Sequence, residues 1–433
     1  MTADHSKNSS GAAYFRRFQP PGRAEFWVFI LATALSLVFS FVVYPRIQEG
    51  LHANVDPDRI GELTRNIYEG RGYVYTDGPA FYPAMNRGPA YPYFVVLLYL
   101  LTGSESLISI QIAQAILHGL LCVVILVLGR RIFDVPTAIL ASILCAIHPM
   151  LLWYTSRVWV ETFLALLVAL VALGTQLIIE RPTAWRGILT GAAIGLATLT
   201  KAVMLPFAFL VVIYVVFRRI RGHLRYALLM LAVSVVIVVP WTIRNYSVSG
   251  AFVGVTTSVG VNMMQGDAVA HFWLDKPFQA LELQSLGQPA IDSVLAGTGQ
   301  TMTDPAGDRR LAFASFSYNV SHPLFLLKRI FINGMTFWYL SESLPKSIFL
   351  LVIQLPLLVF VCLFLKWNLR HFPDANSSIL LLGYYFLAHV LIIGWARYSM
   401  PIISLCIVLA SYFIIHYRGW RQSRFVGFLR GMS

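Results

Sequence analysis

The sequence is poor in charged residues for its length. Only 12% of its 433 residues are Asp, Glu, Lys or Arg, whereas 57% are hydrophobic. Soluble globular proteins contain about 25% charged residues and about 45–50% apolar residues. So few charges could not cover the surface of a water-soluble chain of this size, and the composition excludes that class.

Cysteine is scarce as well. The four cysteines all lie inside apolar stretches and lack the spacing of metal ligands: Cys122, Cys145, Cys362 and Cys406. We interpret them as small core residues rather than as disulfides or ligands. Nothing else in the sequence forms a dedicated metal cage, so we expect neither a metal nor a cofactor.

Long apolar runs are what the chain has in abundance. Each is near the roughly 20 residues that an α-helix needs to cross a bilayer. The first run follows about 25 polar residues, which is typical of an uncleaved span rather than of a cleaved signal peptide. We expect an all-α polytopic membrane protein with about ten transmembrane helices, at 27–45, 106–128, 136–152, 160–179, 187–200, 203–217, 226–243, 347–365, 377–394 and 399–416.

The formal net charge is +13, from 33 Lys and Arg against 20 Asp and Glu. In a soluble protein such an excess would suggest binding to nucleic acid. Here more than half of the basic residues fall in six short segments between the apolar runs, and the positive-inside rule places such segments in the cytoplasm. We therefore expect cytoplasmic termini, contact with membrane lipids and no nucleic-acid partner.

This topology leaves little outside the membrane domain. We expect cytoplasmic tails at 1–25 and 418–433 and a single transmembrane domain over 26–417. Two long segments of that domain, 46–105 and 244–346, then lie on the external side.

Each external segment contains an apolar stretch that cannot cross the bilayer without reversing the topology. The first, 91–102, is too short to span, and the second, 323–339, carries Lys328 and Arg329. We expect both stretches to form helices that lie in the membrane interface or dip partway into the membrane.

Several charged residues fall at the external ends of the predicted spans, where charge is costly and marks functional candidates. Glu161 opens a span, Lys201 separates two short apolar helices and Arg397 precedes the last span. Each also has a structural interpretation. An acid at a helix N-terminus interacts with the macrodipole, a lysine can snorkel to the interface, and arginine is common in interfacial aromatic belts.

The first external segment adds further candidates. Asp56 and Asp58 flank Pro57, and the structural alternative is that Asp56 caps a helix beginning at that proline. Arg65 and Arg87 lie in the same segment, and Arg244 begins the second one.

Gathered in one external cavity, these groups suit a particular chemistry. Arginine and lysine bind phosphate, and a carboxylate beside them can take a proton from an attacking hydroxyl. Cations at that place also stabilise the charge that develops on a departing phosphate. The pattern indicates group transfer from a lipid-linked phosphate donor.

Several short motifs resemble the bacterial GT-C glycosyltransferases, which include the protein O-mannosyltransferase-like family, the aminoarabinose transferases of lipid A and the lipopolysaccharide galacturonosyltransferases. The motifs occur in the same order over residues 30–415. They are Asp56 with 63–73 (LTRNIYEGRGY), 87–93 (RGPAYPY), Glu161, 195–201 (GLATLTK), 240–246 (PWTIRNY) and 396–401 (ARYSMP).

The resemblance implies a GT-C-type bundle in a bacterial inner membrane. It implies transfer of a sugar from a polyprenyl phosphate, with inversion, to an external glycolipid, lipopolysaccharide or protein. In the family the catalytic acid stands ten residues before the Asn of the first-loop helix. Counting back from Asn66 gives Asp56, which we prefer to Asp58 as general base.

The resemblance also implies roles for other residues. Glu161 falls on the second acidic position, which orients the acceptor or supports the base. Lys201 stands where many members have Arg, Arg397 and Tyr398 form the final Arg-Tyr pair, and Arg87 joins them as a candidate contact of the donor phosphate. Ile60 departs from the usual Tyr.

Two other functions fit the same composition. A lipid or sugar transporter would predict paired repeats with interrupted helices, and no such internal symmetry is visible. A non-catalytic lipid-binding protein would tolerate loss of Asp56 and Glu161 together.

Overall fold

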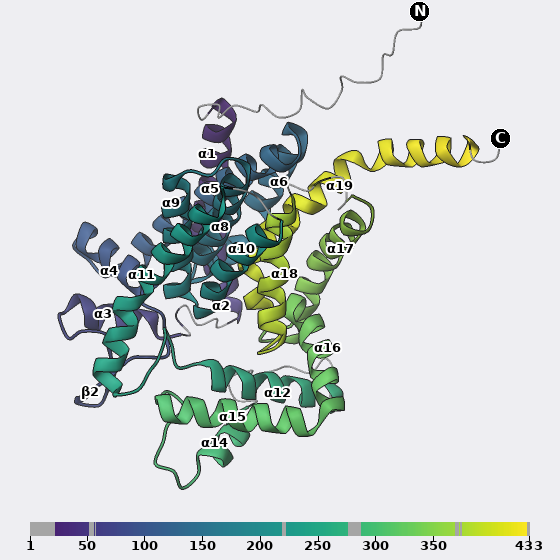
Figure 1. The fold of residues 1–433 in the computed structure, drawn as a ribbon. Helices are drawn as coiled ribbons and strands as arrows, with labels where there is room; N and C mark the ends of the chain where they lie inside the picture. Colours follow the sequence, from purple (N-terminus) through teal and green to yellow (C-terminus); the bar gives the residue numbers. More distant parts are fainter. Residues whose placement is uncertain are drawn as a thin grey trace, which may run out of the picture.

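The computed structural model describes residues 22–430 except 52–55, 57, 219–221, 276–286, 369–371 and 373–374. Most of the described chain is helical (Figure 1). The first half contains α1 (Arg23–Val38), α2 (Tyr44–Leu51), α3 (Ile60–Tyr68), α4 (Ala90–Thr102), α5 (Leu107–Ile132), α6 (Val135–Ile147), α7 (Pro149–Thr155), α8 (Glu161–Glu180) and α9 (Ala184–Thr200). The second half contains α10 (Leu205–Phe217), α11 (Leu224–Ser249), α12 (Val259–Asp275), α14 (Gln288–Leu295), α15 (Pro305–Ser321), α16 (Pro323–Tyr339), α17 (Leu344–Asn368), α18 (Asn376–Val390) and α19 (Ala396–Arg430).

The ten predicted spans all fall on helices. Within the described part of the chain, six helical stretches are long and apolar enough to cross a membrane: Arg23–Glu49, Leu107–Ile132, Glu161–Glu180, Leu224–Ser249, Leu344–Trp367 and Ala396–Tyr417. The pair α6 and α7 makes a seventh if it counts as one span bent by 52°. The bend falls at Pro149, which has no N–H to continue the helical hydrogen bonds. The remaining three, α9, α10 and α18, have 17, 13 and 15 residues.

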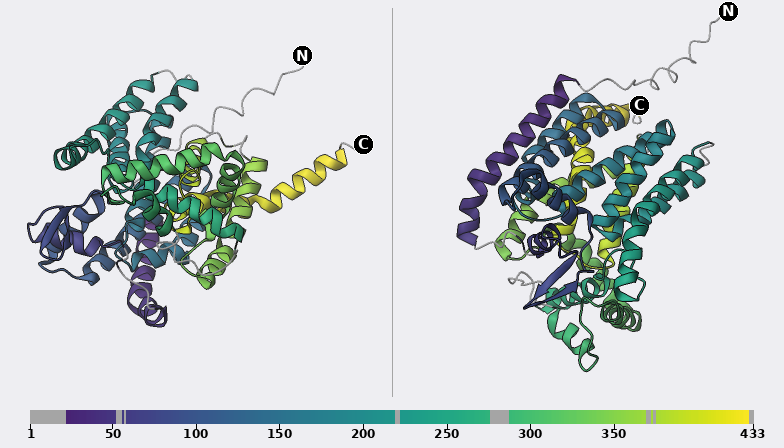
Figure 2. Two further views of the ribbon diagram at one scale, coloured as in Figure 1. Left: turned by 90° about the horizontal axis from the view of Figure 1, so that it is seen from below. Right: turned by 90° about the vertical axis from the view of Figure 1, so that its left-hand side faces the viewer.

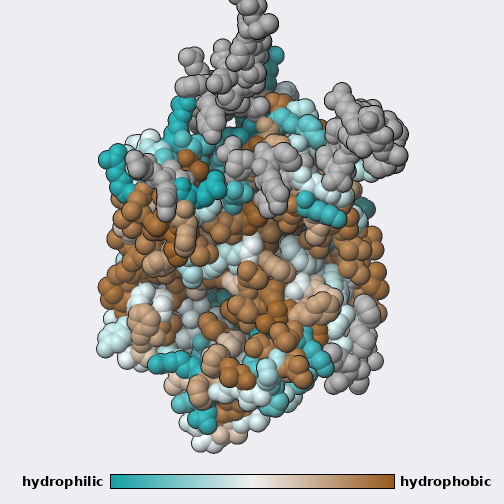
Figure 3. Space-filling model, turned by 45° about the vertical axis from the view of Figure 1, so that its right-hand side comes forward, coloured by the Kyte–Doolittle hydropathy of each residue, from teal (hydrophilic) through white to brown (hydrophobic). Residues whose placement is uncertain are grey.

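The membrane-spanning helices form one bundle around a shared apolar core. Helices α8 and α19 are mostly buried, whereas α1, α11 and α17 turn most of their apolar surface outward. A broad hydrophobic zone covers the middle of the molecule between more polar ends (Figure 3). This distribution is what a lipid-embedded bundle requires, and the all-α polytopic fold class is confirmed.

Small residues allow close helix packing within the bundle. Helices α9 and α11 approach one another at Gly191, where a methyl group would lie 2.4 Å from the carbonyl oxygen of Met230. Small residues at helix interfaces serve this purpose in membranes, where backbones must come close to gain packing energy.

The polar segments gather at one end of the bundle. They comprise α3, a short antiparallel hairpin of β1 (Val74–Asp77) and β2 (Ala80–Pro83), and a layer of α12, α14 and α15 (Figures 1 and 2). We call α12, α14 and α15 the outer layer. The start of α1 and the end of α19 lie at the opposite end of the bundle (Figure 1). The two helices α4 and α16 fall on the apolar stretches predicted to lie in the interface.

Candidate functional site

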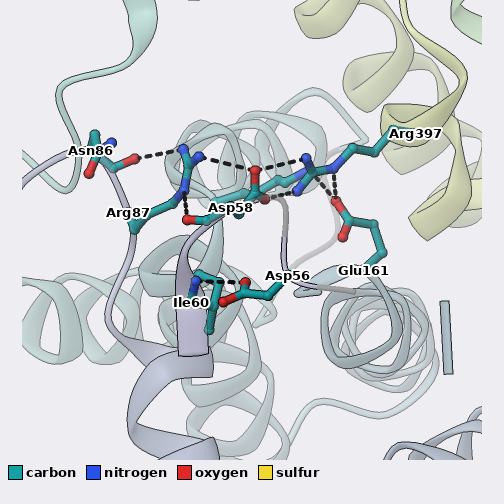
Figure 4. Close-up of polar contacts among 8 residues, drawn as sticks. Asp56, Asp58, Ile60, Asn86, Arg87, Glu161 and Arg397 are labelled. Carbon is teal, nitrogen blue, oxygen red and sulfur yellow. Dashed lines mark hydrogen bonds and ion pairs between the residues drawn. The ribbon is translucent and has the colours of Figure 1, made fainter. Parts of the chain in front are cut away.

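Five charged residues from distant parts of the chain meet where the bundle adjoins α3, and Figure 4 labels four of them, Asp58, Arg87, Glu161 and Arg397. They are Asp58 just before α3, Arg87 just before α4, Glu161 at the start of α8, Lys201 at the end of α9 and Arg397 at the start of α19. We call them the charged cluster. All five were among the candidates from the sequence, and the fold brings them together through helix ends.

Arg397 is the centre of the charged cluster. Its guanidinium group donates to both carboxylate oxygens of Asp58 and, through Nε at 2.6 Å, to Oε1 of Glu161. It also lies over the indole ring of Trp159, 4.4 Å from the centroid. The fixed fork of donors on an arginine suits this bridging of two carboxylates, so one side chain joins the segment before α3 to the helices α8 and α19.

Asp58 is held between two arginines. Besides Arg397, it contacts Nη2 of Arg87 through Oδ1 at 3.1 Å. Burial of Asp58 opposes ionisation, but the guanidinium groups of Arg397 and Arg87 outweigh burial and hold the pKa of this carboxyl well below its usual range. Asp58 is therefore a carboxylate at neutral pH and a weak proton acceptor.

Glu161 is fully buried and pairs with two cations through a single oxygen. Its Oε1 contacts Arg397 and, at 3.2 Å, Nζ of Lys201. Its Oε2 is buried and has no hydrogen-bond partner among the described residues. A buried oxygen in this position can accept a hydrogen bond from a ligand hydroxyl.

Lys201 ends α9 in an extended conformation, followed by a short 3₁₀ turn at Ala202–Met204. This break between two apolar helices lets Nζ of Lys201 lie 4.4 Å from the ring centroid of Tyr398 as well as beside Glu161. Lys201 of α9 thus lies beside the Arg-Tyr segment at the start of α19.

Asp56 lies next to the charged cluster and caps α3. Its Oδ1 accepts from the backbone N–H of Ile60 at 2.7 Å, and its Oδ2 accepts from that of Gly61 at 2.6 Å (Figure 4). These bonds satisfy the first two N–H groups of α3, but the helix begins at Ile60 with Arg59 at the N-cap position, so the predicted helix start at Pro57 is wrong. Pro57 itself lies outside the described residues. Burial raises the pKa of Asp56, partly opposed by these two N–H groups.

Comparisons with known proteins concern the fold that carries the charged cluster. A family model described as dolichyl-phosphate-mannose-protein mannosyltransferase matches residues 86–243, a stretch that includes Arg87, Glu161 and Lys201. The apo oligosaccharyltransferase of Archaeoglobus fulgidus has a TM-score of 0.54 at 16% identity, covering 92% of this chain and 52% of that chain. Its AglB complex with an inhibitory peptide and a dolichol-phosphate gives 0.53 at 15%, covering 92% and 52%. The chain has the GT-C glycosyltransferase fold.

Two other comparisons gave a weaker match or none. ArnT from Cupriavidus metallidurans bound to undecaprenyl phosphate matches with a TM-score of 0.40 at 17% identity, covering 90% of this chain and 77% of that chain. A comparison with curated protein sequences found no match. The chain spans about half the length of the archaeal oligosaccharyltransferase chains.

Two of the secondary candidates lie outside the charged cluster of this GT-C fold. Arg65 is exposed and pairs with Glu105. Arg244 donates to the backbone carbonyls of Tyr73 and Ala84, at 2.9 Å each, and thereby fastens the hairpin region to α11. Their contacts indicate structural roles.

Trp159 belongs to the site and was missed in the sequence. Its ring centroid lies close to two guanidinium groups, 3.9 Å from that of Arg157 and 4.4 Å from that of Arg397. Such contacts are attractive because the ring face carries negative charge. The available signal was its position two residues before Glu161, in a short non-helical stretch with a nearby arginine.

Gly61 leaves the room that the Asp56 carboxylate occupies. A methyl group at Gly61 would lie 2.8 Å from Oδ2 of Asp56. Where space is open, replacing a glycine inside a helix by alanine stabilises the helix by up to about 1 kcal/mol. We expect Gly61→Ala instead to displace Asp56 and to lower any activity that depends on it, measured as kcat against the wild type. Unchanged kcat in a variant whose helix content and melting temperature are also unchanged would contradict this expectation.

Proposed function

We propose that the protein is an integral-membrane glycosyltransferase that moves a sugar from a polyprenyl-phosphate donor to an acceptor outside the cytoplasm. The observation that carries the proposal is the buried charged cluster, in which three cations face two carboxylates. The guanidinium and ammonium groups of this cluster suit a lipid phosphodiester, which carries a single negative charge. In this proposal both termini lie in the cytoplasm of a bacterium, and the outer layer faces the external side.

The donor phosphate is proposed to lie against Arg397, Lys201, Arg87 and Tyr398. The carboxylates of Asp58 and Glu161 hold the cationic groups in place before the donor arrives, which lowers the entropic cost of binding. The charge that grows on the phosphate oxygens as the sugar departs is then met by preorganised donors. The AglB structure, which holds a dolichol-phosphate, supports a donor of this kind.

Asp56 is proposed as the general base. The acceptor hydroxyl gives its proton to Asp56 while its oxygen forms a bond to the anomeric carbon, and the bond from that carbon to the phosphate oxygen breaks. The polyprenyl phosphate leaves with the electron pair, and the configuration of the sugar is inverted. The directions of the pKa shifts favour Asp56 over Asp58 as the base. Burial raises the pKa of Asp56, whereas two arginines lower the pKa of Asp58 and make it a weaker proton acceptor.

Glu161 is proposed to orient the acceptor through Oε2. This oxygen is buried, lies on the carboxylate that Arg397 holds, and has capacity for one further hydrogen bond. An acceptor hydroxyl bound there would be fixed between the base and the donor phosphate, which lowers the entropic cost of reaching a reactive geometry.

Donor affinity tests the phosphate site. With purified protein in vesicles that contain a panel of polyprenyl-phosphate sugars, Lys201→Ala is expected to raise the KM for the donor about 10- to 100-fold, the range for a lost hydrogen bond to a charged group. The KM for the acceptor should stay near the wild-type value. Lys328→Ala, an exposed lysine of α16, is the matched control. An unchanged donor KM in Lys201→Ala would remove Lys201 from the proposed phosphate site.

A further inference from the structure

The segment between α18 and α19 carries Arg397 into the charged cluster. Its residues, 391–395, are not helical, and Arg397 is the second residue of the helix α19 that follows them. The position of the Arg397 guanidinium group therefore depends on what holds this short connection, and the structure shows that α16 holds it.

Arg329 of α16 binds two consecutive carbonyls of the connection. Its Nη1 donates to the carbonyl oxygen of Leu391 at 2.9 Å, and its Nη2 donates to that of Ile392 at 2.8 Å. The carbonyls at a helix C-terminus lack partners within the helix and need donors from elsewhere. Arg329 is only 2% exposed, so this is a buried charge used as a backbone clamp.

Two further contacts from α16 complete the clamp. Nδ2 of Asn333 donates to the carbonyl oxygen of Val390 at 3.1 Å, and the N–H of Ala396 donates to the carbonyl oxygen of Leu340 at 2.9 Å. Gly394 lies so close to α16 that a methyl group there would be 2.1 Å from the carbonyl oxygen of Asn333. The connection is thus fixed from Val390 to Ala396, one residue before Arg397.

The same arginine reaches the outer layer. Nε of Arg329 forms an ion pair with Oδ1 of Asp267 on α12 at 2.6 Å. Asp267 in turn accepts from Nδ2 of Asn319 on α15 at 2.9 Å and from the hydroxyl of Ser315. One buried network therefore joins α12 and α15 to the segment that carries Arg397.

We propose that Arg329 is a positioning residue for Arg397, and that the Arg329–Asp267 pair couples the outer layer to the charged cluster. Displacing the clamp moves Arg397 relative to Asp58 and Glu161. A displacement of about 1 Å in such a group can lower the catalytic rate about 100-fold. Nothing in the charged cluster itself needs to change for this effect. The inference rests on the proposed function only in taking a lipid phosphate as the ligand.

Two variants test the clamp without touching the charged cluster. Arg329→Lys keeps the charge but loses the fork that binds two carbonyls, and Gly394→Ala pushes the connection away from α16. We expect both to weaken binding of undecaprenyl phosphate in vesicles by about 10- to 100-fold, measured by titrating the tryptophan fluorescence of the purified protein. In sugar transfer they should raise the KM for the donor and leave the KM for the acceptor near the wild-type value.

The controls separate positioning from general damage. Arg309→Lys, at an exposed arginine of α15 whose Nε donates to the carbonyl of Pro305, should bind the lipid as the wild type does. Wild-type lipid affinity and donor KM in both Arg329→Lys and Gly394→Ala would overturn the inference. So would an equal loss of donor and acceptor affinity together with a lowered melting temperature, since that marks a purely structural role. A wild-type protein that binds no undecaprenyl phosphate would instead count against the proposed function.

Discussion

Asp56→Asn is expected to lower kcat for sugar transfer about 100- to 10,000-fold, the usual contribution of a general base. Asparagine has nearly the same shape, and its amide oxygen can still accept one of the two N–H groups at the start of α3. The amide cannot accept the proton of the acceptor hydroxyl. The rate should be measured at saturating donor and acceptor, so that the change reflects the chemical step rather than binding.

The control for this substitution is Asp77→Asn. Asp77 lies in the same stretch between α2 and α4, at the exposed end of β1, so the same change of charge there should leave kcat within about twofold of the wild type. Equal rates for Asp56→Asn and the wild type would remove Asp56 as the base and would direct attention to Glu161.

Arg397→Ala is expected to have the largest effect on stability. It leaves Glu161, which is fully buried, and Asp58, which is 7% exposed, without the guanidinium group that bridges them. We expect a loss of about 3–5 kcal/mol in the free energy of unfolding, because two buried carboxylates each lose a hydrogen bond to a charged group worth about 1.5–3 kcal/mol. Among the described residues, Asp58 then keeps only Arg87 as an ion-pair partner, and Glu161 keeps only Lys201. Denaturant unfolding of the purified protein in detergent would measure the change.

Arg65→Ala provides the comparison for Arg397→Ala. Arg65 also pairs with a glutamate, but its side chain is 61% exposed, and exposed ion pairs contribute about 0–1 kcal/mol. The difference between the two variants isolates burial as the cause. A change in Arg397→Ala as small as that in Arg65→Ala would show that the bridge does not hold the charged cluster together.

The helical fold could be predicted from the apolar runs because each run must satisfy its backbone hydrogen bonds internally in a membrane. The same reasoning placed ten helices, and it also indicated that α9 and α10 would be short. The hairpin of β1 and β2 was not predicted, since two strands of four residues leave almost no periodic signal.

The charged cluster could be predicted in membership but not in detail. Glu161, Lys201 and Arg397 stood out because charges at helix ends within apolar surroundings are rare. The bridging of Asp58 by two arginines was beyond reach, because the distance between residues 58 and 397 in space depends on the packing of the whole bundle. Arg329 gave no signal beyond its place in an apolar stretch, since its partners are backbone carbonyls.

The central claim is that the protein transfers a sugar, and the chemical fate of the polyprenyl-phosphate donor tests it most directly. Purified protein in sealed vesicles would receive a polyprenyl-phosphate sugar and an acceptor extract of bacterial envelopes, and mass spectrometry would follow the lipid. The account predicts that free polyprenyl phosphate is released with the wild type and that its release falls with Asp56→Asn in step with the transferred sugar. Passage of the intact donor across the membrane, with no free polyprenyl phosphate formed, would contradict it and identify a transporter.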